Sequence, residues 1–367
     1  MTADLFGERF IGMRTPAWHK LGIILPDDQQ VTASKAFEQA NLNFKYHTLP
    51  IGVTLPDGTQ VAIGTDKAVY REPTPDSPQW KSLGVVSKDY EVLQNESLAR
   101  GLDAISSKTG WKFETAGALG SGETIFVCLK TGTHSISGDE VDSYFLVSDG
   151  KAGNRALQIS VTPVRVVCQN TLIMSDTDSE LMITVPHTNG VEQEYTFWLE
   201  MISQLQRSQE TVFENLRRLA DKKITDDIAK RIFLDAFPEP IANQKVRLSR
   251  NIETMTIEDS VRQDAKGALS SAIQAYEYNM AQSIKWRDGA FTLYERFNDG
   301  AEQGGQMSPA ALESLRGTAY AAVQAVAEIC DWGGMNRDSV ASSTLFGGRA
   351  NQKARSWYSA MKVLAEG

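Results

Sequence analysis

The sequence predicts an α+β fold, in which a strand-rich antiparallel N-terminal core is followed by a C-terminal region of long helices. Residues 1–190 contain short apolar runs separated by turn signals, whereas residues 191–367 contain long stretches with apolar residues at helical spacing. Few helical segments interrupt the predicted strands, which favours α+β over a doubly wound parallel sheet. We therefore divide the chain into an α+β core domain, residues 1–190, and a helical region, residues 191–367.

The N-terminal half begins with a short helix and a β-hairpin. Thr32 is a favourable N-cap for the helix, and Asp57-Gly58 lies between two extended runs, residues 45–53 and 59–63. Glycine accepts the positive φ that a tight hairpin turn needs. Further strands are predicted over residues 67–71, 83–87, 111–116, 124–130, 143–148 and 156–168, with one helix starting at Asn95. The proline-rich segment 71–80 predicts an exposed loop.

The C-terminal half predicts a series of helices. Apolar residues between Phe197 and Leu219 keep helical spacing, and a second helix runs from Thr225 to Phe237, before Pro238. A long third helix is expected over residues 257–297. Ser308-Pro309 is a start signal for a fourth, which we expect to continue through Cys330 and to end before Gly333.

Composition places limits on the class of protein. The 367 residues carry a net charge of -9, with 41% hydrophobic and 23% charged residues, which is typical of a folded protein. No window approaches about 18 uninterrupted apolar residues, so we expect no membrane span. The N-terminus does not resemble a secretory signal, and three scattered cysteines (Cys128, Cys168 and Cys330) favour a reducing compartment. We therefore expect a cytoplasmic protein.

Motifs for catalysis and metal binding are sparse. The four histidines are not spaced as ligands with one another or with a cysteine, and the glycine-rich segment 117–122 precedes a strand instead of a helix, unlike a phosphate-binding loop. Cys168 has no adjacent base and reads as a core cysteine. We predict no catalytic residue, metal or cofactor. An acidic group comprising Asp139, Glu140, Asp142 and Asp149 is left with two interpretations, an exposed acidic loop or a magnesium site.

Two basic segments are candidates for contact with phosphate. The first, residues 149–155, combines glycines with Lys151 and Arg155 between two strands, and it is either an ordinary loop or an anion contact. The second, residues 346–358, contains Arg349 and Lys353 close to Trp357. Its alternative interpretation is a C-terminal helix that buries the tryptophan and leaves its charges in solvent.

Several segments, taken together, resemble the phage/plasmid-like protein family, known as domain of unknown function 932. The most specific block is Pro163-Val-Arg-Val-Val-Cys-Gln-Asn-Thr-Leu172. The other matching segments are Pro16–Gly22, Leu83–Val86 with Tyr90, Thr115–Gly117, Asp149-Gly150, Thr318–Tyr320, Ala325-Val326 and Phe346-Gly347. The resemblance implies a protein of a mobile element in the cytoplasm of a bacterial host, and it brings no established catalytic residues. Ser148 precedes Asp149-Gly150 where the family often has histidine, so a mechanism that needs that histidine is in doubt.

We expect from these observations a protein that binds single-stranded DNA. The predicted layout is similar to that of the phage single-strand annealing proteins of the Redβ, RecT and Erf groups, which form rings or filaments, so a homo-oligomer is also expected. Local basic side chains suffice for a DNA groove even when the net charge is negative. The candidate contacts are Lys151, Arg155, Arg165, Trp111, Lys112, Arg349 and Lys353.

Two other functions stay open. The first is a protein-binding oligomer that modulates host defence or replication, for which an acidic surface would serve. The second is a metal-dependent enzyme acting on nucleotides or nucleic acid, which would gather the carboxylates of residues 139–149 around a metal ion.

Overall fold

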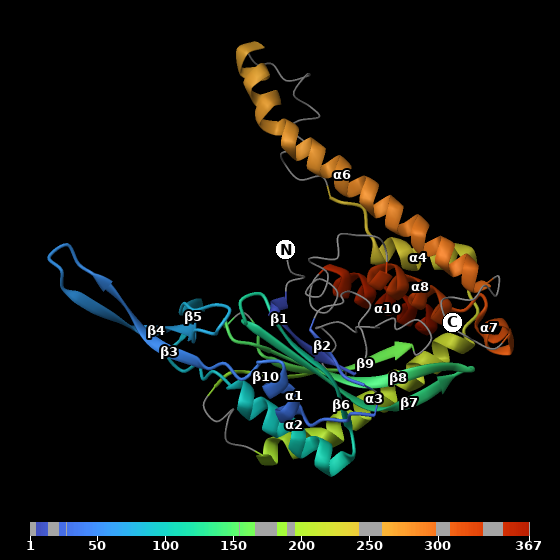
Figure 1. Cartoon of the computed structure of the whole chain (residues 1–367). Helices are drawn as coiled ribbons and strands as arrows, with labels where there is room; N and C mark the ends of the chain where they lie inside the picture. The colour runs from blue at the N-terminus through green and yellow to red at the C-terminus, as the bar shows by residue number, and fades with distance from the viewer. Residues whose placement is uncertain are drawn as a thin grey trace.

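The computed structural model describes residues 5–13, 22–26, 28–153, 155–165, 182–188, 195–241, 259–298, 309–332 and 348–366 (Figure 1). Within them, strands occupy the N-terminal half and helices the C-terminal half. The predicted α+β class is therefore confirmed. No helix among these residues is long and apolar enough to cross a membrane.

The strands form two sheets. The larger has the order β10-β9-β8-β7-β6-β1-β2, and the smaller has the order β3-β4-β5. All pairs are antiparallel except β1 with β2. The strands are β1 (Leu5–Gly12), β2 (Ile23–Ile24), β3 (Tyr46–Thr54), β4 (Gln60–Arg71), β5 (Lys81–Ser87), β6 (Lys112–Leu119), β7 (Thr124–Ile136), β8 (Asp139–Gly150), β9 (Leu157–Arg165) and β10 (Met182–Val185).

Helices cover the larger sheet. In Figure 1, α1 (Ala33–Gln39), α2 (Asn95–Thr109) and much of α3 (Tyr195–Asp221) lie below it, and α4 (Asp226–Ala236), α8 (Ala319–Trp332) and α10 (Gly348–Ala365) lie above it. The short α7 (Pro309–Leu315) precedes α8. The main apolar core combines strand residues such as Phe145 and Ile159 with helix residues such as Leu102, Phe213 and Trp357. The division at residue 190 stays a prediction.

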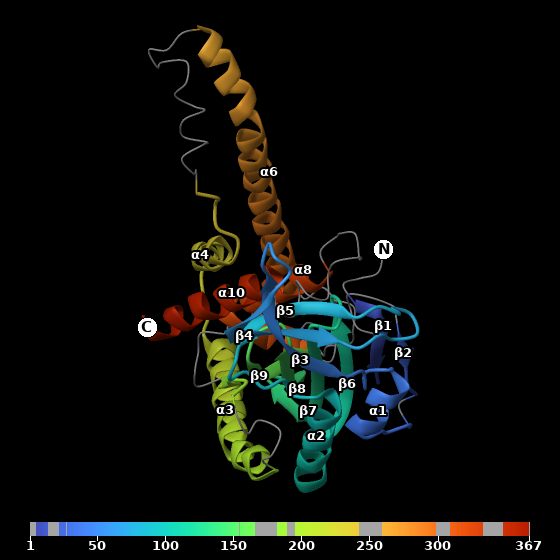
Figure 2. The same cartoon turned by 90° about the vertical axis from the view of Figure 1, so that its left-hand side faces the viewer.

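Two elements project from this body. The hairpin of β3 and β4 extends to one side in Figure 1, and the 40-residue helix α6 (Asp259–Asn298) extends away from the bundle in both Figure 1 and Figure 2. The C-terminal part of α6 packs on α4, α7 and α8, where Ala290 and Tyr294 are fully buried. The hairpin is longer than expected, because the two predicted strands at residues 59–63 and 67–71 form the single strand β4.

The predicted fourth helix is wrong in one respect, since it is broken into α7 and α8. Gly317 adopts a left-handed φ of 65°, and the Thr318 hydroxyl then accepts a hydrogen bond from Ala321 N at 3.1 Å, as an N-cap of α8. The break also lets Ala319 N bond to Lys222 O at 2.9 Å, after α3. Continuous apolar spacing across residues 312–330 therefore conceals a turn.

We predict that Gly317→Ala destabilises the protein by about 1 kcal/mol, because alanine disfavours the left-handed conformation. A Cβ at Gly317 would meet no atom within 4 Å, so the loss would come from the backbone alone. Urea unfolding of the purified variant measures it. Gly58→Ala, at another open position with a positive φ in an exposed turn, is a matched comparison. An unchanged midpoint for Gly317→Ala would contradict the assignment of this break.

Candidate functional site

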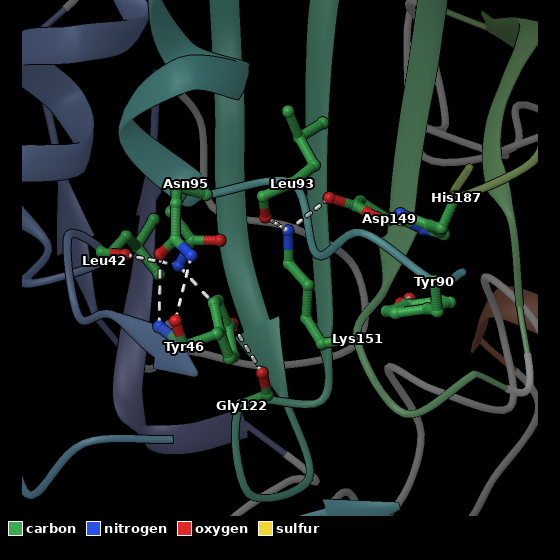
Figure 3. Close-up of polar contacts among 11 residues, drawn as sticks. Leu42, Tyr46, Tyr90, Leu93, Asn95, Gly122, Asp149, Lys151 and His187 are labelled. Atoms are coloured by element: carbon green, nitrogen blue, oxygen red, sulfur yellow. Dashed lines mark hydrogen bonds and ion pairs between the residues drawn. The ribbon is translucent and has the colours of Figure 1, made fainter. Parts of the chain in front are cut away.

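The predicted contact Lys151 lies at the centre of a buried polar cluster. Strand β8 ends at Asp149-Gly150, and the backbone N–H of Lys151 donates to Glu123 O at 2.7 Å, beside the turn between β6 and β7. The Lys151 side chain is fully buried, forms an ion pair with the Asp149 carboxylate and donates to Leu93 O at 2.5 Å (Figure 3). Its charge is therefore satisfied inside the protein, and the interpretation of Lys151 as a phosphate contact is corrected.

Asp149 has a second buried partner. His187 Nε2, in the segment after β10, lies 2.9 Å from Asp149 Oδ1, and both side chains are shielded from solvent. Burial by itself would raise the pKa of the Asp149 carboxyl, but the charge of Lys151 and the contact with His187 hold that pKa below its ordinary value. The Tyr90 ring lies against His187, with 4.9 Å between ring centres, and its hydroxyl donates to Gly150 O.

Tyr46 closes the other side of the cluster. The Lys151 ammonium group lies 5.1 Å from the centre of the Tyr46 ring, and the Tyr46 hydroxyl donates to Gly122 O at 2.7 Å. Burial raises the pKa of Tyr46 well above its ordinary value, so the hydroxyl stays protonated and remains a donor. The Gln94 side chain pairs with both the N–H and the carbonyl of Tyr46, as a neighbouring strand would. The cluster therefore connects the small sheet and α2 to the large sheet.

The predicted basic residues of α10 are also buried. Lys353 forms an ion pair of 2.7 Å with Asp331 of α8, and both side chains are fully shielded from solvent. Arg349 donates to Cys330 O at 2.6 Å, and its guanidinium carbon lies 5.3 Å from the centre of the Trp286 ring. These two cations join α10 to α8 and α6. Since Trp357 is buried as well, the structure supports the alternative interpretation of a packed C-terminal helix, with its cations also enclosed.

The structure describes the two predicted arginines near β9 to different extents. Arg155 is partly buried between β8 and β9 and donates to Gln158 Oε1 at 2.7 Å. The backbone of Arg165 pairs with Val141, but the side chain lies outside the described residues, as does Cys168 with residues 166–181.

The two described cysteines, Cys128 and Cys330, are free thiols. Burial raises the pKa of each to about 12, so they stay protonated near neutral pH.

The acidic group is neither an exposed loop nor a gathered site. Asp139, Glu140 and Asp142 lie on β8, where alternation places Asp139 on one face and Glu140 and Asp142 on the other. Asp139 and Asp142 are buried and Glu140 is exposed. Asp139 accepts a hydrogen bond from Tyr320 of α8, whereas Asp142 pairs with Lys130. Among the residues that the structure describes, no group of three or more histidine, cysteine or acidic residues could hold a metal ion.

Of the remaining predicted pair, Lys112 lies at an open depression of the large sheet, whereas Trp111 packs on the opposite face of that sheet. Lys112 is exposed at the start of β6, directly opposite Lys130 of β7. Trp111 is partly buried, with its ring against Phe145 at 4.6 Å between centres. The depression is lined by Met13, Gln30, Gly110, Lys112, Glu114, Lys130, Thr131 and Gly132. The cross-strand row that contains Lys112 and Lys130 continues to Tyr144 on β8. Tyr144 lies roughly 20 Å along β8 from Gly150, the end of the strand near Arg155.

Lys130 is a candidate that sequence reasoning missed. Two lysines directly opposite on neighbouring strands repel each other. Asp142, whose side chain is 2% exposed, forms an ion pair of 2.7 Å with Lys130, whereas Lys112 forms no ion pair within the described part of the chain. The depression therefore has two lysines side by side, with Glu114 also in its lining, and an anion bound between the lysines would relieve their repulsion.

We predict that Asp149→Asn lowers the free energy of unfolding by about 3–5 kcal/mol at pH 7, because it leaves the Lys151 charge buried without its partner. In the wild-type protein the depressed folded-state pKa of Asp149 stabilises the fold above its unfolded pKa, near 3.9, and this contribution disappears as the pH falls toward the folded pKa. The variant should therefore lose less stability between pH 5 and pH 3. Urea unfolding at each pH measures both effects.

The control for this experiment is Glu140→Gln, an exposed carboxylate on the same strand. It should leave the pH dependence of the wild-type protein in place. An Asp149→Asn profile parallel to that of the wild type would contradict the role given to the buried pair.

Comparison with known proteins identifies a family. The model of the family described as Domain of unknown function (DUF932) matches residues 82–356, which is 275 of the 367 residues and extends from β5 into α10. No curated protein and no solved structure matches the chain. The match includes Asp149, Lys151 and His187 of the buried cluster and Lys112 and Lys130 of the depression, whereas Tyr46, Met13 and Gln30 precede it. The chain is therefore a member of the DUF932 family.

Proposed function

We propose that this chain is a phage or plasmid protein that binds single-stranded DNA at the depression between the ends of β6 and β7. The observation that supports it most is the exposed Lys112 directly opposite Lys130 at the rim of that depression. The resemblance of the sequence to phage/plasmid-like proteins supports the mobile-element origin.

The chemistry of the depression suits a flexible anionic strand. A phosphate group placed between the two lysines would neutralise their repulsion and compete with Asp142 for Lys130. Trp111 does not add a stacking surface to the depression, because its ring packs on Phe145 on the opposite face of the sheet. Basic groups that contact the phosphate backbone are a common part of single-strand binding sites.

The acidic balance of the chain is compatible with this site. The net charge is -9, so binding would depend on the local charge of the depression and not on a general attraction to nucleic acid. Few phosphate contacts imply moderate affinity for one chain, which repetition of the site in an oligomer would increase.

Of the two alternatives, the protein-binding oligomer has a specific observation in its favour, since the small sheet exposes large apolar side chains such as Leu49, Val61 and Val85. The metal-dependent enzyme has less support, because Asp139, Asp142 and Asp149 each contact a different side chain within the described residues.

We predict that Lys112→Ala weakens binding of a labelled oligothymidylate by about three- to tenfold at low salt, since one phosphate contact is removed. The slope of log K against log salt should fall by about 0.7, the value for one counterion on a single strand. Fluorescence anisotropy over a salt series measures both quantities. Lys130→Ala would be harder to interpret, because it would also leave the buried Asp142 carboxylate without its ion-pair partner.

Lys35→Ala is the matched control, because Lys35 is an exposed lysine on α1 that is not among the residues lining the depression. It should change neither the affinity nor the slope. Absence of binding by the wild-type protein at low salt would overturn the proposal, as would equal effects of the two variants.

A further inference from the structure

The small sheet has one face on which large apolar side chains are exposed, although the small Ala68 between two of them is buried. At its base, Tyr46, Val69 and Val86 are buried against the body of the protein. The opposite side of the same sheet exposes Leu49 (48%) and Val85 (60%), which flank Ala68 in one cross-strand row. Side chains alternate between the two faces of a strand, so these residues point away from the core.

The exposed face continues along the projecting hairpin. Ile51 pairs with Ile63 and Val53 pairs with Val61, and all four lie on the same side as Leu49 because β3 runs through without a bulge. Val53, Val61 and Ile63 are 49%, 45% and 39% exposed. We name the six residues Leu49, Ile51, Val53, Val61, Ile63 and Val85 the apolar sheet face. The other side of the hairpin has small or polar residues, Gly52, Thr54, Gln60 and Ala62.

This face is large and without charge. Six partly exposed side chains of this size form an apolar patch on the order of 400–500 Å², a size at which patches on soluble proteins usually serve binding. Residues 48–65 contain a single charged residue, Asp57 in the turn, and no lysine or arginine. The absence of lysine and arginine argues against DNA as the occupant, because DNA binding depends on contacts between cations and phosphates. The near absence of charge also leaves this face without the charge complementarity that gives specificity for a different protein.

The apolar sheet face needs a second layer to cover it whenever the chain is folded. A two-stranded ribbon is marginally stable in water, and here its β-branched side chains have no neighbouring layer among the described residues. A second copy of the chain is present whenever the first is, and its own apolar sheet face has matching chemistry. Two such faces packed as in a β-sandwich would together bury on the order of 1,000 Å², near the lower limit for specific interfaces.

We propose that the apolar sheet face is a dimer interface, on which the same face of a second copy packs around a two-fold axis. The contact is isologous, since each copy offers the same residues. The polar rim would consist of the His47–Glu72 pair, 2.7 Å apart, at one end, and the Asp57 turn at the other. This inference is independent of the proposed DNA site, which lies on the large sheet.

Val61→Glu and Gln60→Glu test the proposal as a matched pair, because the two positions are adjacent on β4 and point to opposite sides. Sedimentation velocity and mass photometry on the full chain, without DNA, should show a wild-type species of twice 40.4 kDa at micromolar concentration. Val61→Glu should raise the dissociation constant at least about fiftyfold, because it places an unpaired charge in the interface. Gln60→Glu should change it by less than about twofold.

Val85→Glu provides a second variant at the base of the same face, and it should weaken the dimer in the same way. Both positions are exposed in one chain, so circular dichroism should stay unchanged. A wild-type protein that stays monomeric at 50 µM would overturn the proposal, as would a dimer that survives both variants or one that Gln60→Glu dissociates equally. A monomer that retains a bound foreign protein through Val61 would overturn it in favour of a different partner.

Discussion

The burial of the Lys151 ammonium group is the constraint on which the arrangement of the two sheets depends. A lysine charge can remain in a protein interior only if several groups replace its water. Here the Asp149 carboxylate, the Leu93 carbonyl and the Tyr46 ring do so, and they come from β8, from the segment before α2 and from β3. Meeting this requirement brings the small sheet, α2 and the large sheet to one point.

The same principle acts in the C-terminal half. Lys353 and Asp331 form a buried pair between α10 and α8, and Arg349 adds a bond to the Cys330 carbonyl. The charges that sequence inspection assigns to nucleic acid thus hold elements together. The surfaces that are open to a ligand are the depression at Lys112 and the apolar sheet face of the hairpin. One surface carries charge and the other carries none, so they suit different partners.

Local signals predicted the parts of the fold that depend on neighbouring residues. Thr32 caps α1 as expected, and the turn at Gly58 and the glycine-rich segment 117–122 join strands as expected. Burial of Lys151 could not be predicted, since its partner carbonyl at Leu93 is 58 residues away. Nor could the pairing of Lys112 with Lys130, because a bulge between Phe113 and Thr115 shifts the register by one residue. The signal for the apolar sheet face, an uncharged run from residue 58 to residue 65, is visible in the sequence, but its exposure is not.

Hydrogen exchange, read by mass spectrometry on the wild-type protein and on Lys151→Met, tests the central claim most directly. If the buried charge joins the sheets, the variant should lose protection in residues 46–50 and 67–71 and at the start of α2, while the paired centre of β7 and β8 keeps it. Equal protection in both proteins, or a uniform loss across the large sheet, would contradict the account. The first result would mean that the small sheet is held in place without the ion pair, and the second that the pair serves the whole core alike.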